Sequence, residues 1–224
     1  RSSRTVPFLF FFTGVPIANI ATKVMLGDKL DELGYVGLGK KRNRWYVKSP
    51  TFSFSKITGM DVVLSPEMKS TGEAIGYDYS LNRALYKSLR ASGIKVANYG
   101  TIFATIADKD KEKALPLIRR FYNLGFNIEA TSGTAKFLKS NGIKTRVKRK
   151  ISEGSEEILD SIRKGYVTYV INTQDDRDSN FLDGKLIRRC AIDNNVYVFT
   201  CLDTVNVLLD VLEEITMGIS VIDK

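Results

Sequence analysis

Residues 126–135 read FNIEATSGTA, a β-rich run that passes directly into a segment rich in hydroxyl groups and glycine. We expect a strand at 126–130 and a helix at 133–140. Glycine lets a backbone approach a ligand closely, and the first turn of a helix leaves N–H groups unpaired. The hydroxyl groups of Thr131, Ser132 and Thr134 surround Gly133 with further donors. The segment therefore predicts a phosphate cradle, and the open alternative is a threonine N-cap beside an ordinary turn glycine.

The same alternation of strand and helix recurs from residue 93 to residue 224. This spacing predicts a parallel sheet with helices on both faces, in which ligands bind beyond the carboxyl ends of the strands. We therefore expect a Rossmann-like α/β domain at 93–224, with a boundary after Ser92. The expected strands are 101–107, 126–130, 145–147, 167–172 and 196–200, and the expected helices are 112–124, 133–140, 156–164, 187–194 and 204–215.

Three further residues lie where such a domain would hold a ligand. Lys111 stands at the start of the helix after the first strand, and Lys150 ends the basic run KTRVKRK at 144–150. Most charges of that run are expected to form a solvated strand face. Asn172 ends a strongly β-forming run, where its amide would hydrogen-bond a base or sugar, or simply form a turn.

The first 92 residues have a different organisation, which we interpret as α+β. The apolar run at 4–12 is far short of the ~20 residues that span a bilayer, and we expect it to be a buried strand. A helix is expected at 15–26, an edge or antiparallel strand at 45–57, and a helix from the N-cap Ser80 to Ala91. A domain seldom begins just before its most apolar strand, so we expect the chain to be part of a longer protein.

Composition excludes some classes of mechanism. The 224 residues include no histidine, which removes imidazole bases and ligands, and only two cysteines, which fit a reduced cytoplasmic protein. The net charge is +9, with 14 basic and 7 acidic residues up to residue 92 and 20 and 18 after it. Aromatic residues are not interleaved with the basic ones as in RNA-binding modules. An acidic partner, or the rest of a larger protein, is at least as good an explanation as a nucleic acid.

Several motifs resemble the large subunit of carbamoyl phosphate synthetase. The runs RSSRTVPF at 1–8, TGVP at 13–16 and PEMKSTGE at 66–73 look like the C-terminal end of its second ATP-grasp half. The runs ATSGT at 130–134 and VINT at 170–173 are similar to its C-terminal allosteric domain, which has a methylglyoxal-synthase-like fold. The resemblance assigns 1–92 to the truncated synthetic half and 93–224 to the allosteric domain.

The resemblance implies a ligase that makes carbamoyl phosphate from bicarbonate, glutamine-derived ammonia and two ATP, for pyrimidine and arginine synthesis. The full enzyme would use ATP with Mg or Mn, a glutaminase small subunit and the upstream part of its own subunit. The family's metal-binding and ATP-binding residues lie upstream, so no catalytic or metal residue is expected in this chain. We expect a cytoplasmic protein without membrane or nucleic-acid partners.

The resemblance also implies a site for a phosphorylated effector, either uridylate, inosinate or phosphoribosyl pyrophosphate. Carried over by position, Thr131, Ser132, Gly133, Thr134, Lys111 and Lys150 would hold the phosphate, and Asn172 and Thr173 would contact ribose and base. Ser49 stands where ornithine-responsive members carry a glutamate, which argues against activation by ornithine.

Two other functions remain open. A lyase of the methylglyoxal synthase type shares the fold, but the absence of histidine argues against it. A nucleic-acid-binding module built on 144–150 would show binding that depends steeply on salt.

Overall fold

The computed structural model describes residues 5–37, 42–54, 68–173 and 181–217. The chain divides into two compact units, the first made of Arg1–Phe52 and Ser70–Ile94 and the second of Ser53–Lys69 and Lys95–Lys224. The division near residue 94 falls close to the boundary expected after residue 92. The expected motif residues 1–4 and 66–67 lie outside the described residues.

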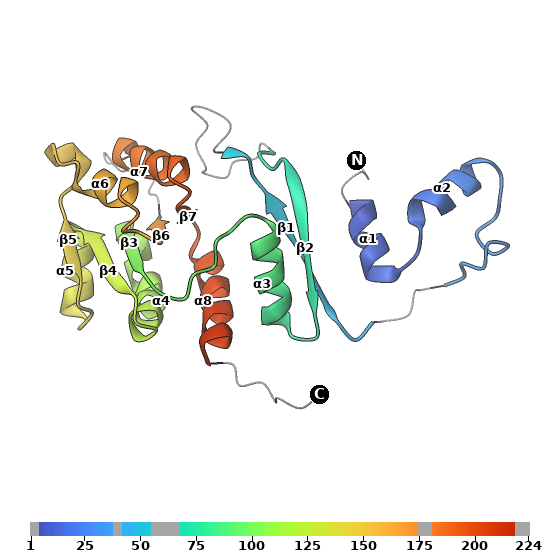
Figure 1. The fold of residues 1–224 in the computed structure, drawn as a ribbon, viewed down its shortest axis with the longest axis horizontal. Helices are drawn as coiled ribbons and strands as arrows, with labels where there is room; N and C mark the ends of the chain where they lie inside the picture. Colours follow the sequence, from blue (N-terminus) through green and yellow to red (C-terminus); the bar gives the residue numbers. More distant parts are fainter. Residues whose placement is uncertain (1–4, 38–41, 55–67, 174–180, 218–224) are drawn as a thin grey trace. The chain divides into compact units, whose positions relative to one another are not determined.

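The second unit is built on a five-stranded parallel sheet, which confirms the predicted fold class (Figure 1). The strand order is β5-β4-β3-β6-β7, so β3 lies at the centre of the sheet. Its neighbours β4 and β6 both run parallel to it. The strands are β3 (Thr101–Thr105), β4 (Asn127–Thr131), β5 (Arg146–Lys148), β6 (Tyr169–Asn172) and β7 (Tyr197–Phe199).

Helices cover both faces of this sheet (Figure 1). On one face α6 packs against α7, and on the other α4 packs against α5 and α8. The core under α6 and α7 includes Phe103, Ile158 and Ile187. The helices are α4 (Lys111–Asn123), α5 (Ser132–Ser140), α6 (Glu157–Arg163), α7 (Phe181–Asp193) and α8 (Leu202–Met217), with short 3₁₀ turns η2 (Asp108–Asp110) and η3 (Ile151–Glu153).

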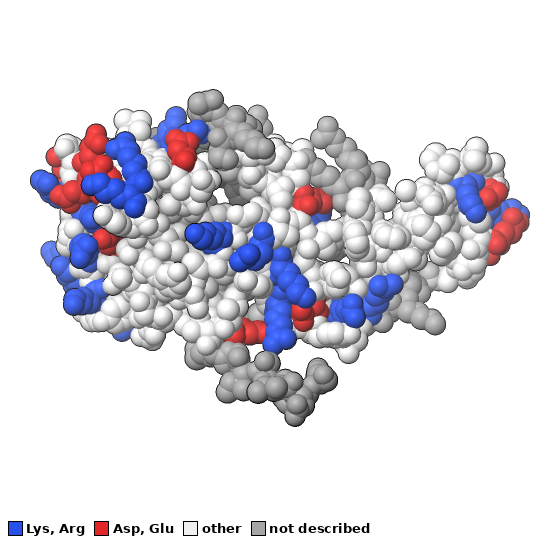
Figure 2. All heavy atoms as spheres, in the orientation of Figure 1, with Lys and Arg blue, Asp and Glu red and all other residues white. Residues whose placement is uncertain are grey.

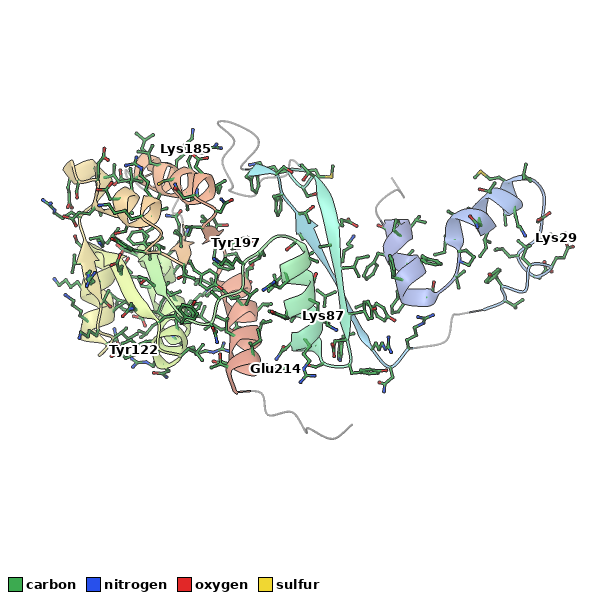
Figure 3. All side chains as sticks on the ribbon, in the orientation of Figure 1. Lys29, Lys87, Tyr122, Lys185, Tyr197 and Glu214 are labelled. Atoms are coloured by element: carbon green, nitrogen blue, oxygen red, sulfur yellow. The ribbon has the colours of Figure 1, made fainter. Side chains whose placement is uncertain are left out.

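The first unit combines a two-stranded antiparallel sheet with helices. Strand β1 (Trp45–Thr51) pairs with β2 (Gly72–Asp78), and α3 (Leu81–Ala91) packs against both. Gly76 permits the close approach of α3, because an added Cβ would meet the carbonyl oxygen of Ala84. Lys87 of α3 pairs with Asp78 at the end of β2 at 2.6 Å (Figure 3). The expected N-cap is confirmed, since the Ser80 hydroxyl accepts a hydrogen bond from the Arg83 amide.

The prediction of a buried strand at 4–12 is wrong. Residues Thr5–Thr13 form helix α1, and Phe10, Phe11 and Phe12 are 45%, 53% and 41% exposed. A short apolar run has no periodicity that separates strand from helix. Pro7 lies in the first turn of α1, where its missing N–H breaks no helical hydrogen bond.

The expected helix at 15–26 is confirmed as α2 (Ile17–Met25). In the described part of the chain, no single helix is long and apolar enough to cross a membrane. Helices α1 and α2 are long and apolar enough for a membrane span only when taken together, and the chain bends by 110° between them.

Candidate anion-binding site

The predicted ligand residues gather at the carboxyl edge of the parallel sheet. Thr131 ends β4, Asn172 ends β6, and Lys111 begins the helix that follows β3. Because β3 lies between β4 and β6, the segments that leave these three strands are neighbours. This edge is the usual ligand position in such sheets.

Helix α5 begins at this edge without a side-chain cap. Thr131 occupies the N-cap position with extended backbone angles, but its side chain makes no capping hydrogen bond. In an α-helix the first four N–H groups have no partner within the helix. Ser132 and Gly133 in this first turn are exposed, so their backbone is accessible to a ligand. Threonine capping, the alternative left open above, is therefore absent from α5.

Lys111 brings a positive charge to this first turn. A Cβ placed on Gly133 would lie 3.8 Å from Lys111 Nζ, so the ammonium group lies close to the Gly133 backbone. The Lys111 side chain is only 17% exposed. A helix N-terminus and a cation are thus aimed at the same small region, and both attract anions.

The Asp108 carboxylate forms an ion pair with Lys111. It lies 2.5 Å from Lys111 Nζ, while the Asp108 side chain is 93% exposed. The pKa of Asp108 is lowered, first by the hydrogen bond and charge of Lys111 and to a smaller extent by the charge of Lys150. Lys150 therefore acts on the same end of the site. Its backbone amide is bonded to Glu153 Oε2 at 3.3 Å where η3 begins.

The hydroxyl groups of Thr134, which is buried, and Thr173, which is half-buried, hold the loop after β3 in place. Thr134 Oγ1 accepts a hydrogen bond from the Ile106 amide at 3.2 Å, and Thr173 Oγ1 accepts one from the Ala107 amide at 2.9 Å. Thr134 is 2% exposed. Both threonines lie at the predicted site: Thr134 ties the first turn of α5 to this loop, and Thr173 ties the residue after β6 to it.

Asn172 is also engaged within the protein. It is 4% exposed, and its side-chain oxygen accepts a hydrogen bond of 2.6 Å from Arg188. Its contact with a ribose or base stays a prediction, and it would use the amide nitrogen.

Sequence reasoning did not find two residues of this region, Asp108 and Arg188. Arg188 belongs to α7 and is 1% exposed. In the sequence it stands next to Arg189, and two consecutive arginines look like solvent-exposed charges. Only the structure shows that Arg188 is buried beside Asn172. The nearest signal for Asp108 was its spacing of three residues before Lys111, which brings side chains together in a helical turn.

The chemistry of this edge suits anion binding. In the described ranges, no group of three or more acidic or cysteine side chains is arranged to hold a metal ion.

The fold and this edge define a Rossmann-like α/β domain with an uncapped helix start beside a lysine. The family model described as MGS-like domain matches residues 113–200. The chain therefore contains an MGS-like domain, and the match runs from within α4 to the end of β7.

Proposed function

We propose that this chain is the regulatory part of a carbamoyl phosphate synthetase large subunit, and that its carboxyl-edge site binds a phosphorylated effector. The effector would be uridylate, inosinate or phosphoribosyl pyrophosphate. One observation carries the proposal: Lys111 Nζ lies beside Gly133 in the first turn of a helix that has no side-chain cap. The MGS-like domain is compatible with this role.

The phosphate would accept hydrogen bonds from the first-turn amides of α5 and from Lys111. To reach Lys111 it must displace the Asp108 carboxylate, which is exposed and therefore free to turn into solvent. Lys150 would add charge from the other side, and the Asn172 amide and Thr173 would face the sugar or base. Ser132 is exposed and would donate its hydroxyl group.

Regulation would follow from differential affinity. An effector that binds one conformation of the subunit better than another shifts the balance between them, by no more than that difference in affinity. In the full protein we expect this shift to control the synthetase reaction, with its ATP, its Mg or Mn and its glutaminase partner. The segment before the MGS-like domain would belong to an ATP-grasp half.

Calorimetric titration of the chain with uridylate, inosinate and phosphoribosyl pyrophosphate tests the proposal. We expect at least one to bind, and Lys111→Ala to weaken it about tenfold to a hundredfold, as for loss of a charge-assisted hydrogen bond. Lys113→Ala is the matched control, because Lys113 is exposed on the same helix. Equal affinity in wild type and Lys111→Ala would contradict the assignment.

A further inference from the structure

A hollow lies between helix α6 and the β4–β5 side of the sheet. Its volume is about 520 Å³, within the usual range of ligand pockets of about 300–1,000 Å³. Its lining runs from Thr101 at the start of β3 and Tyr166 before β6 to Lys148 at the end of β5. None of the residues assigned above to the anion-binding site lines this hollow. Figure 2 shows basic and acidic side chains intermingled around α6.

A buried carboxylate faces this cavity with one oxygen unsatisfied. Glu129 on β4 is 5% exposed, and its Oε2 has no hydrogen-bond donor among the described residues. Lys148 Nζ lies 3.6 Å away and donates to Ser161 Oγ at 2.9 Å instead. Arg146 is 3.4 Å from the other carboxylate oxygen, Oε1. Oε2 therefore has the Lys148 ammonium group as its ion-pair partner but accepts no hydrogen bond, and a hydroxyl donor that reached this oxygen would supply one.

The charges of the lining select the kind of donor. Three cationic side chains, Arg146, Lys148 and Lys164, face three carboxylates, those of Glu129, Glu157 and Asp160. Glu129 already faces two cations, so an ammonium group would be repelled by them. An inorganic anion would meet the three carboxylates instead. A neutral hydroxyl group has neither disadvantage, and its hydrogen bond to a carboxylate is of the stronger, charge-assisted kind.

The remaining lining residues suit a hydroxylated molecule. Ser161 and Thr101 offer hydroxyl groups that donate and accept, and Lys148 and Arg146 offer N–H donors. Tyr166, 64% exposed, adds an aromatic ring with a polar tip.

We propose that this cavity binds a neutral polyhydroxylated small molecule of sugar type. One hydroxyl group donates to Glu129 Oε2, and others accept from Lys148 and Arg146. This inference is independent of the effector proposed above, because it uses none of the same residues. The sugar comes either free or as part of a nucleoside.

The test is ligand-observed NMR titration of the whole 224-residue chain with D-ribose, D-glucose, myo-inositol and uridine. We expect saturable binding of at least one probe. Glu129→Gln should weaken it about tenfold, since the charge-assisted hydrogen bond becomes a neutral one. Glu112→Gln removes an exposed carboxylate elsewhere and should leave it unchanged. Binding of a free sugar assigns the site to free sugars, and binding of uridine alone assigns it to a nucleoside.

Lys111→Ala separates the two sites, since sugar binding should survive this change. If Glu129→Gln does not fold, Arg146→Met serves instead, because the Arg146 side chain is 76% exposed. The proposal is overturned if no probe binds saturably, if Glu129→Gln binds as well as wild type, or if Lys111→Ala abolishes the binding.

Discussion

Replacing Asp108 by asparagine should strengthen the binding of a phosphorylated effector. The Asp108 carboxylate is paired with Lys111 at 2.5 Å, in the place where a phosphate would have to bind. The change keeps the size of the side chain and removes its charge. It frees Lys111 and removes a negative charge from the neighbourhood of the phosphate.

The magnitude follows from the exposure of the pair. An exposed ion pair contributes roughly 0.2–1 kcal/mol, and Asp108 is 93% exposed. Two like charges about 4 Å apart in water repel by about 1 kcal/mol, and salt reduces this further. We therefore expect a gain of about 1 kcal/mol, which is about fivefold in Kd at low ionic strength and less at high salt.

Calorimetric titration with uridylate, inosinate and phosphoribosyl pyrophosphate, at low and high salt, measures this gain. Glu112→Gln is the control. Glu112 follows Lys111 in α4, so the change removes a nearby negative charge, but among the described residues no ion pair joins Glu112 to Lys111. Weaker binding by Asp108→Asn would refute the reasoning, since Asp108 would then be needed to position Lys111. An equal gain in Glu112→Gln would mean that only net charge matters.

Two substitutions and one chemical modification test the fold. Arg120 lowers the pKa of Glu213 below its ordinary 4.5, so this pair stabilises the fold above that pH and the benefit is lost as pH falls through the lower folded-state value. Glu213→Gln should therefore cost about 1 kcal/mol in urea unfolding at pH 7, and this cost should shrink as the pH is lowered below 4.5; a difference that stays constant with pH would contradict this. Gly76→Ala should destabilise the first unit by about 1–3 kcal/mol in thermal unfolding, because its Cβ meets the α3 backbone, and an unchanged midpoint would be inconsistent with the packing. Burial raises the pKa of the Cys190 thiol while Cys201 is exposed, so mass spectrometry after brief iodoacetamide treatment at pH 8 should find Cys201 modified first, and the reverse order would argue against the burial.

The sequence predicted the second unit well because its elements have clear periods. Helices at 112–124 and 133–140 and strands at 126–130 and 167–172 all appear in the structure within a few residues. Buried parallel strands alternate there with amphipathic helices, and glycines mark the ends.

The first unit was harder to predict. The apolar run of α1 lacks a period, so its type depends on what surrounds it. Strand β2 was missed because it contains Gly72, Ala74 and Gly76, which have low strand propensity, and its conformation comes from pairing with β1.

Part of the candidate site could be predicted from the order of strands and helices in the sequence. Lys111 and Gly133 could be picked because strand ends and helix starts are local features. The pairing of Asn172 with Arg188 could not, because it depends on how α7 packs across the end of β6. The ion pair of Asp108 likewise depends on the side-chain rotamers that Lys111 and Asp108 adopt.

The two threonine hydrogen bonds to the loop after β3 affect how an anion would be received. Thr134 holds Ile106 from the α5 side, and Thr173 holds Ala107 from the β6 side. The loop thus loses its conformational entropy when the domain folds, before any ligand arrives. Binding would then demand little further ordering, since the surface is preorganised and only the exposed Asp108 side chain has to move.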